Sequence, residues 1–166
     1  MIIVETERLR LRRFTLDDAE FVLGLLNEPS FHRYIGDKGV RTLDDARDYL
    51  RSGPLASYET YGYGLFLTSL KDGDVPIGMC GVLQRDNLDH PDVGFAFKPD
   101  FWGQGYATEA AAAVMEWGRR EKGLEKIIAV TMQENQASAA VLERVGLRFE
   151  RLIQFFENEP PSRLFS

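Results

Sequence analysis

The stretch spanning residues 92–109 constrains the fold of this chain more than any other. It reads D-V-G-F-A-F-K-P-D-F-W-G-Q-G-Y-A-T-E, an apolar run followed by a loop with two glycines and the start of an alanine-rich segment. Glycine lets the backbone approach a ligand closely, and the unpaired N–H groups of a helix N-terminus favour a phosphate in front of them. The stretch predicts a strand, a tight loop and a helix that together form a phosphate cradle.

Two common nucleotide-binding motifs do not fit this loop. A Walker loop requires Gly-Lys-Ser/Thr, which is missing here, and the Rossmann fingerprint requires a third glycine where this chain has Thr108 after Gly103 and Gly105. A lone Gly-x-Gly is also frequent in tight turns that bind nothing. On spacing alone, phosphate binding and a purely structural turn both stay open, as does a nucleotide-binding protein of another fold.

Composition limits the partners of the chain. Its 166 residues suit one domain spanning residues 1–166, and a net charge of −6 argues against non-specific nucleic-acid binding. No apolar run approaches the ~20 residues of a membrane helix, and residues 1–5 do not resemble a signal peptide, so we expect a cytoplasmic protein with no membrane partner. Cys80 is the only cysteine, which excludes an internal disulfide and a cysteine-rich metal site. We predict no bound metal.

Hydrophobic periodicity predicts a mixed α/β fold. Helices are expected at 16–26, from residue 42 onward, at 106–122 and after residue 135, and strands at 6–13, 65–70, 75–83, 93–97, 126–132, 148–156 and 163–165. The second and third strands read as a hairpin, and the apolar fifth strand is expected at the centre of the sheet. Because strands and helices alternate only after residue 92, the sheet should be largely antiparallel with one βαβ unit.

Four segments, in order, give the chain a family resemblance. They are T-E-R-L-R-L-R-R-F-T-L-D-D-A at 6–19, P-I-G-M-C-G at 76–81, V-G-F-A-F-K-P-D-F-W-G-Q-G-Y-A-T-E-A at 93–110, and N-x-x-S-x-x-V-L-E-R-V-G-L at 135–147. Together they resemble the GCN5-related N-acetyltransferases. Trp102 departs from the general pattern, which has Gln or Arg there, and it is usual for the RimJ/RimL-like branch of ribosomal-protein N-terminal acetyltransferases.

The resemblance implies a fold and a cofactor. It implies a twisted, mostly antiparallel sheet of about six to seven strands, splayed between the fourth and fifth strands and flanked by about four helices. The pantetheine arm of acetyl-CoA would enter the splay and pair with the backbone of Phe95, Ala96 and Phe97. The pyrophosphate would lie on the N–H groups of the loop and first helical turn, which comprise Gly103, Gln104, Gly105, Tyr106, Ala107 and Thr108.

Direct attack of an amine on a thioester requires a deprotonated amine, a donor to the developing oxyanion and a proton for the thiolate. By resemblance, Ser138 would lie near the sulfur of CoA and protonate the thiolate, although an early helical serine also commonly bonds to backbone. Asn135 would bind pantetheine or cap the helix. Asp92 is a candidate for taking the amine proton, against the simpler interpretation of a surface aspartate at a strand end.

The resemblance implies transfer of acetyl from acetyl-CoA to a primary amine, either a protein N-terminus or a small amine, by a monomer or homodimer. A non-catalytic CoA-binding regulatory module is the alternative. Five aromatic residues in the weakly patterned region before the second strand either line an acceptor pocket or fill the core: Phe31, Tyr34, Tyr58, Tyr61 and Tyr63.

Overall fold

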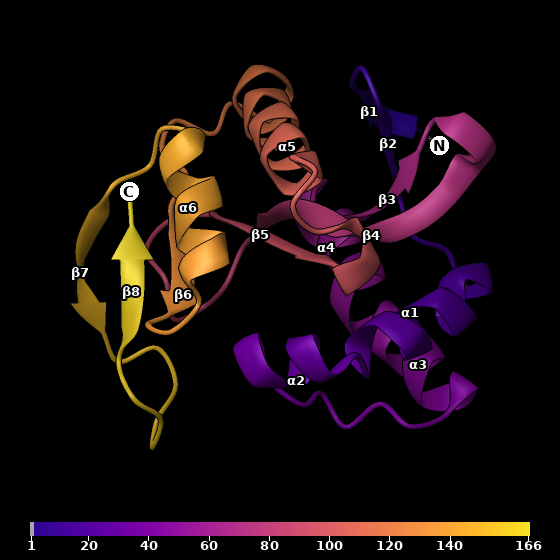
Figure 1. Ribbon diagram of the computed structural model, residues 1–166, viewed down its shortest axis with the longest axis horizontal. Helices are drawn as coiled ribbons and strands as arrows, with labels where there is room; N and C mark the ends of the chain where they lie inside the picture. Colours follow the sequence, from indigo (N-terminus) through magenta and orange to yellow (C-terminus); the bar gives the residue numbers. More distant parts are fainter. Residues whose placement is uncertain (1) are drawn as a thin grey trace.

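The computed structural model describes residues 2–166, which form two antiparallel β-sheets and the helices around them (Figure 1). The larger sheet has the strand order β1 (Ile2–Glu5), β2 (Leu9–Arg12), β3 (Leu65–Leu70), β4 (Val75–Leu83) and β5 (Asp92–Phe97). The smaller sheet has the order β6 (Ala129–Met132), β8 (Ser162–Phe165) and β7 (Phe149–Ile153). The predicted mixed α/β fold with a mostly antiparallel sheet is confirmed.

Six α-helices lie in the described residues, more than the four expected. They are α1 (Ala19–Leu26), α2 (Pro29–Tyr34), α3 (Leu43–Leu50), α4 (Ala56–Tyr61), α5 (Tyr106–Lys122) and α6 (Gln136–Arg144). A capping box precedes α3, where the Thr42 hydroxyl accepts the Asp45 N–H at 3.0 Å and the Asp45 carboxylate accepts the Thr42 N–H at 3.2 Å. The repeated T-L-D-D sequence thus starts a helix by satisfying N–H groups that have no partner inside it.

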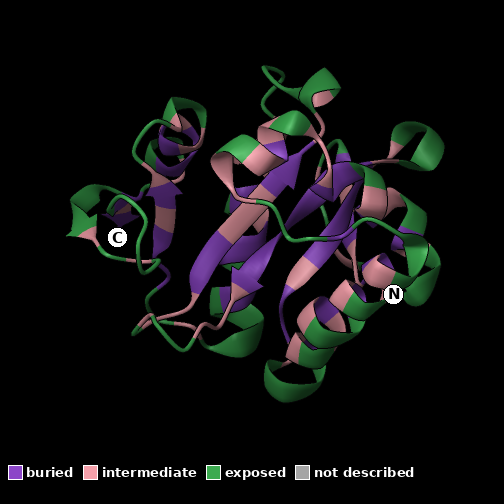
Figure 2. Cartoon of the chain, turned by 90° about the horizontal axis from the view of Figure 1, so that it is seen from below, coloured by how far each residue is buried: buried purple, intermediate pink, exposed green. Residues whose placement is uncertain are grey.

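Helices cover both faces of the larger sheet. On one face α5 packs Val114 and Trp117 against Phe66 of β3 in one core cluster, and on the other face Leu26 of α1 and Leu50 of α3 belong to a second cluster. Figure 2 shows the strands largely buried between helices whose outer surfaces are exposed. Each such side chain stabilises the fold by about 1.5–3 kcal/mol when fully buried. Both faces of the sheet are therefore covered by packed helices, which leaves its two edge strands, β1 and β5, as the places where a ligand could pair with the backbone.

Two predicted strands differ from the structure. The predicted strand at 6–13 is shortened to β2, because the Thr6 N–H donates to the Leu9 carbonyl at 2.9 Å and the Thr6 hydroxyl accepts the Leu9 N–H at 3.0 Å. These bonds close a turn that follows β1, a strand that the sequence did not predict. The strand predicted at 126–132 as central is buried, but β6 pairs only with β8 and meets β5 at one isolated bridge. The eight strands thus form two sheets, where one sheet of about six to seven was expected.

The hairpin of β3 and β4 depends on Gly81. A Cβ atom at Gly81 would lie 1.9 Å from the carbonyl oxygen of Gly64, so only glycine allows these backbones to approach as they do. Cys80 beside it is fully buried, and burial raises the pKa of its thiol, which agrees with its expected role as a small core residue. None of the helices in residues 2–166 combines the length and the apolarity that a membrane span requires.

Candidate active site

The two sheets touch at Asp92 and then separate. Asp92 and Ile128 form a parallel bridge, in which the Val93 N–H donates to the Ile128 carbonyl and the Ile128 N–H donates to the Pro91 carbonyl, both at 2.9 Å. No other backbone pair joins β5 to β6 within the described part of the chain. The predicted splay between the fourth and fifth strands is therefore present, and Asp92 lies at its narrow end.

Strand alternation decides which backbone groups of β5 face the gap. The Lys98 N–H donates to Ile77 of β4 at 2.9 Å and the Val93 N–H donates to Ile128, so odd-numbered residues of β5 point their backbone away from β4. Phe95 and Phe97 thus present their backbone to the gap, whereas Ala96 can contribute only its methyl group. This corrects the expectation that all three would pair with pantetheine through their backbone.

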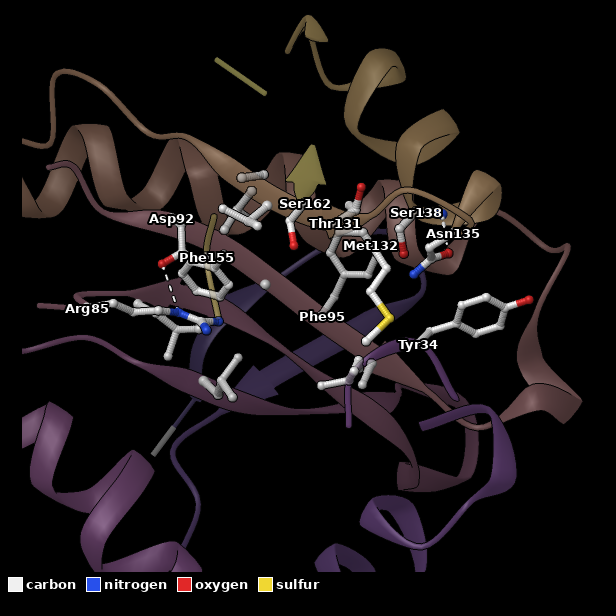
Figure 3. Close-up of a pocket in the computed structure, with 18 of the residues that line it drawn as sticks. Tyr34, Arg85, Asp92, Phe95, Thr131, Met132, Asn135, Ser138, Phe155 and Ser162 are labelled. Atoms are coloured by element: carbon white, nitrogen blue, oxygen red, sulfur yellow. Dashed lines mark hydrogen bonds and ion pairs between the residues drawn. The ribbon is translucent and has the colours of Figure 1, made fainter. Parts of the chain in front are cut away.

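A cavity of about 390 Å³ occupies the space between the sheets (Figure 3). Its walls include residues of β5, β6, α2, α3 and α6, with single residues from the neighbouring strands and loops. Five of the predicted site residues line it: Asp92, Phe95, Ala96, Asn135 and Ser138. Figure 3 shows Asp92 with Arg85 at one end of the cavity and Ser138 with Asn135 at the other. The remaining predicted residues, Phe97 and the loop at 103–108, do not line this cavity.

Asp92 is buried, with 2% of its surface exposed, so the interpretation as a surface residue is wrong. Burial raises its pKa to about 6, although the ion pair with Arg85, at 3.2 Å between Nε and Oδ1, acts in the opposite direction. A carboxylate with this pKa is mostly ionised at neutral pH and binds a proton far more readily than an exposed aspartate. It therefore has the properties expected of a general base.

Ser138 and Asn135 make one contact with each other through the helix cap. The Asn135 side-chain oxygen accepts the Ser138 N–H at 3.1 Å, which caps α6. The Ser138 hydroxyl makes no hydrogen bond to any residue in the range 2–166, and the same holds for the Asn135 side-chain amide nitrogen. Both groups line the cavity and are available to a ligand.

The glycine loop presents a series of backbone N–H donors. Gly103 and Gly105 have φ angles of +75° and +84°, which favour glycine, and α5 begins directly after them. Within residues 2–166 no protein acceptor is bonded to the six backbone N–H groups from Gly103 to Thr108. Consecutive free N–H groups at the N-terminus of a 17-residue helix favour an anion.

A contact that the sequence did not predict fastens this loop to the larger sheet. The Arg8 guanidinium pairs with Glu109 at 2.7 Å, donates to the Gln104 carbonyl at 2.9 Å and lies 4.3 Å from the Tyr106 ring centroid. Burial would raise the pKa of Glu109, but hydrogen bonds from Thr6 and Arg8 hold it below its usual value. About a hundred residues separate these partners, so no local pattern reveals the contact, although both lie in family-like segments.

Of the five aromatic residues that were expected either to line an acceptor pocket or to fill the core, some do each. Phe31 and Tyr34 line the cavity, whereas Tyr58 and Tyr63 are buried in the core and Tyr61 is exposed elsewhere.

Among the lining residues that the sequence did not suggest are Lys38, Tyr49, Arg85 and Phe155. The Arg85 guanidinium carbon lies 5.3 Å from the Phe155 ring centroid. Burial raises the pKa of Tyr49 to about 12, so its hydroxyl stays protonated. Asp92, Arg85 and Tyr49 thus form a polar end in a mostly apolar cavity, as is usual for small-molecule sites.

Comparisons with known proteins agree with this geometry. Residues 8–148 match a family model described as an acetyltransferase (GNAT) domain. The chain is 31% identical over 147 residues to an uncharacterized N-acetyltransferase, YnaD, of Bacillus subtilis, covering 89% of this chain and 83% of that protein. A solved GNAT-family acetyltransferase from Bacillus anthracis is 27% identical with a TM-score of 0.81, covering 99% of this chain and 96% of that one.

The solved structures also include RimL, a ribosomal L7/L12 alpha-N-protein acetyltransferase in complex with coenzyme A. It matches with a TM-score of 0.85 at 17% identity and covers 99% of this chain and 96% of that one. At this identity the likeness concerns the fold alone.

Proposed function

This chain belongs to the GNAT family of acetyltransferases and uses acetyl-CoA, and from that premise we propose that it transfers the acetyl group to a primary amine by direct attack in a ternary complex. One observation carries the proposal: a single cavity places a buried carboxylate, Asp92, at one end and a free hydroxyl, Ser138, at the other. Both sheets contribute to this cavity, so we also propose that residues 1–166 act as one catalytic domain.

The chain offers acetyl-CoA a fitting surface in two places. We propose that the N–H groups of Gly103, Gln104, Gly105, Tyr106, Ala107 and Thr108 bind the pyrophosphate, with the Thr108 hydroxyl as a further donor. The exposed backbone edge of Phe95 and Phe97 would pair with the amide groups of pantetheine as an added strand does. The Phe97 carbonyl already accepts the Trp102 indole N–H at 2.9 Å, which leaves its N–H as the free group. Asn135 would donate its side-chain amide.

Asp92 would take the proton of the incoming ammonium group. An α-ammonium group has a pKa of about 8, so transfer to a carboxylate of pKa about 6 is uphill by about 2 units, compared with about 4 units for an ordinary aspartate. The raised pKa therefore removes roughly 3 kcal/mol from this step. A lysine side chain, with a pKa of about 10.4, would be harder to deprotonate, so the proton-transfer step taken alone favours amines of lower pKa.

Ser138 would donate its hydroxyl proton to the departing thiolate and recover a proton from solvent. The nucleophilic amine, freed of its first proton by Asp92, forms the new C–N bond as the thioester C–S bond breaks, and its second proton is released to solvent as the neutral amide forms. No covalent enzyme intermediate is required, because the acceptor itself is the nucleophile.

The shift in Tm on ligand binding, read together with CoA release, distinguishes an acetyltransferase from a non-catalytic CoA-binding module and from a nucleotide-binding protein. At 100 times Kd, a ligand that binds only the folded state adds about 2.7 kcal/mol, which raises Tm by roughly 5–10 °C for a domain of this size. We expect this shift with acetyl-CoA and CoA, and little with ATP or NAD. Stabilisation without CoA release from any of a panel of amines and N-terminal peptides would favour the non-catalytic CoA-binding module. The RimJ/RimL-like branch, a cytoplasmic location and a monomeric or homodimeric state stay predictions.

We expect Ser138→Ala to lower kcat by about 10²-fold, because the thiolate loses its proton donor, while the Kd of CoA changes little. CoA release and calorimetric titration measure the two quantities. Gln136→Ala is the matched control, since Gln136 is exposed in the same helical turn. Wild-type turnover in Ser138→Ala would show that this serine serves only the helix cap.

A further inference from the structure

The cavity has a polar end whose charges are not balanced. Lys38 and Arg85 are the two cationic side chains that line it, and Asp92 is the one carboxylate. Arg85 uses its Nε to pair with Asp92 at 3.2 Å, and its two terminal nitrogens make no hydrogen bond to any residue in the range 2–166. Within the same range Lys38 makes neither an ion pair nor a hydrogen bond. One positive charge therefore remains without a counter-ion.

Lys38 and Arg85 lie close enough to affect each other. Desolvation of the Lys38 ammonium, and after it the charge of Arg85, lower the pKa of Lys38, although the residue as a whole is exposed. Two cations held together without a shared anion destabilise each other, so an anionic ligand between them is favoured. Arg85 is well placed for this role, because its guanidinium lies over the Phe155 ring and keeps its planar N–H fork available.

These contacts constrain an acceptor amine. A simple amine arrives as a cation and would meet Asp92 together with two positive charges. Resting on the proposed transfer function, we infer that the acceptor is a small amine that carries its own anionic group within a few bonds, a free amino acid or a close analogue of one. Its ammonium group would meet Asp92 and its carboxylate would meet Arg85 and Lys38.

The separation of charges in the site fits such a zwitterion. Arg85 and Asp92 are in contact, so groups bound to each lie only a few ångströms apart, which matches an α-amino acid. A protein N-terminus has its first carboxyl group converted to an amide and offers no anion at this position. Next to the cavity is a second hollow whose lining includes four carboxylates: Asp37, Glu134, Glu157 and Glu159. These four carboxylates are exposed and screened by solvent, as is Lys38, which lines this hollow too; Arg85, which pairs with the buried Asp92, is therefore the stronger of the two proposed anion contacts.

The test compares each of the common L-amino acids with its amide and with the amine that lacks the carboxyl group, alongside N-terminal peptides. CoA release gives kcat and KM. We expect kcat/KM to be at least about ten-fold higher for the preferred amino acid than for its amide, mainly through KM, as loss of a charged hydrogen bond implies. The amine of the amide is the easier to deprotonate, so this order cannot arise from amine basicity. An aminophosphonate analogue tells a carboxylate site from a general anion site.

Lys38→Met isolates the anion contact because Lys38 does not pair with Asp92. It should raise KM for the amino acid about ten-fold more than KM for the amide, and Lys38→Arg should restore most of the difference. Lys126→Met is the control, since Lys126 is exposed and does not line the cavity. Arg85→Gln should raise KM and also shift the acidic limb of the pH–rate profile upward, because the ion pair that lowers the pKa of Asp92 is lost.

The outcomes separate this inference from the proposed function. Acetylation of peptides or plain amines, but of no free amino acid, overturns the inference and leaves the transferase intact. Equal kcat/KM for amino acid and amide also overturns it. If acetyl-CoA stabilises the protein but no amine of any class is acetylated, the proposed transfer function fails together with the inference.

Discussion

Replacing Asp92 with asparagine is expected to lower kcat by about 10²-fold or more and to abolish the acidic limb of the pH–rate profile near pH 6. In the wild type, activity should fall below about pH 6 as the carboxylate becomes protonated and can no longer accept the amine proton. Asparagine has the same shape and no ionisation in this range, so its residual rate should lack that limb. The profile of kcat/KM between pH 5 and 9, with CoA release as the readout, measures both effects.

The stability of the folded protein should respond to pH in the opposite direction to its activity. The pKa of Asp92 in the folded protein lies above its unfolded value of about 3.9, so the folded state binds the proton more tightly. The wild type therefore loses stability as pH rises from about 4 to about 6, by up to roughly 3 kcal/mol, and Asp92→Asn should not. Above pH 6 the variant should be at least as stable as the wild type. Lower activity with undiminished stability is the signature of a functional residue.

Asp89→Asn is the control for this variant, since Asp89 is an exposed carboxylate in the loop that leads to Asp92. It should leave the rate and the pH profile unchanged. A wild-type rate and a wild-type acidic limb in Asp92→Asn would remove Asp92 from the role of base and leave a water as the proton acceptor.

Gly105→Val is expected to weaken the binding of CoA by about 100-fold. Gly105 has a φ of +84°, which costs a β-branched residue about 1–3 kcal/mol, and its Cβ would lie 3.3 Å from a terminal nitrogen of Arg8. Strain at this position would displace the loop that Arg8 fastens and turn the N–H groups away from the phosphates. Losing one or two hydrogen bonds to a charged group costs about 1.5–3 kcal/mol each, which gives the stated factor. Calorimetric titration with CoA measures it.

Gly123→Val separates loss of the phosphate site from loss of stability. Gly123 ends the same helix and has a φ of +65°, and a Cβ atom at this position would meet no other atom within 4 Å. This variant should suffer a similar backbone strain and a similar fall in Tm, but should keep the wild-type Kd for CoA. If Gly105→Val remains folded and binds CoA as the wild type does, the loop is a structural turn and not a phosphate cradle.

Local patterns predicted the parts of this protein whose physical cause is local. Helix α5 ends at Gly123 because glycine accepts the left-handed conformation there, and the capping box of α3 is closed by residues three positions apart. The hairpin of β3 and β4 follows from two apolar runs joined by turn residues. The loop at 103–108 could be predicted for the same reason, since two glycines directly before a helix indicate a tight loop from the neighbouring residues alone.

Sequence patterns did not predict the features that depend on residues far apart in the chain. Periodicity made β6 a buried strand but could not assign it to a second sheet, because its partner β8 lies about thirty residues further along the chain. Asp92 looked like a surface residue because the side chains that bury it come from other segments of the chain. The contact of Arg8 with Glu109 and the pairing of Arg85 with Asp92 likewise leave no trace in local composition.

The sequence by itself determined the strand, loop and helix that present free backbone N–H groups, the proposed phosphate site, because backbone conformation there follows from glycine and from helix start signals. It also determined the family, through four ordered segments. Only the tertiary structure decided the chemistry of the polar end of the cavity. The pKa of Asp92 depends on burial, and the unbalanced charge of Lys38 and Arg85 depends on which side chains meet in one cavity. Both are properties of the assembled sheets and of no single segment.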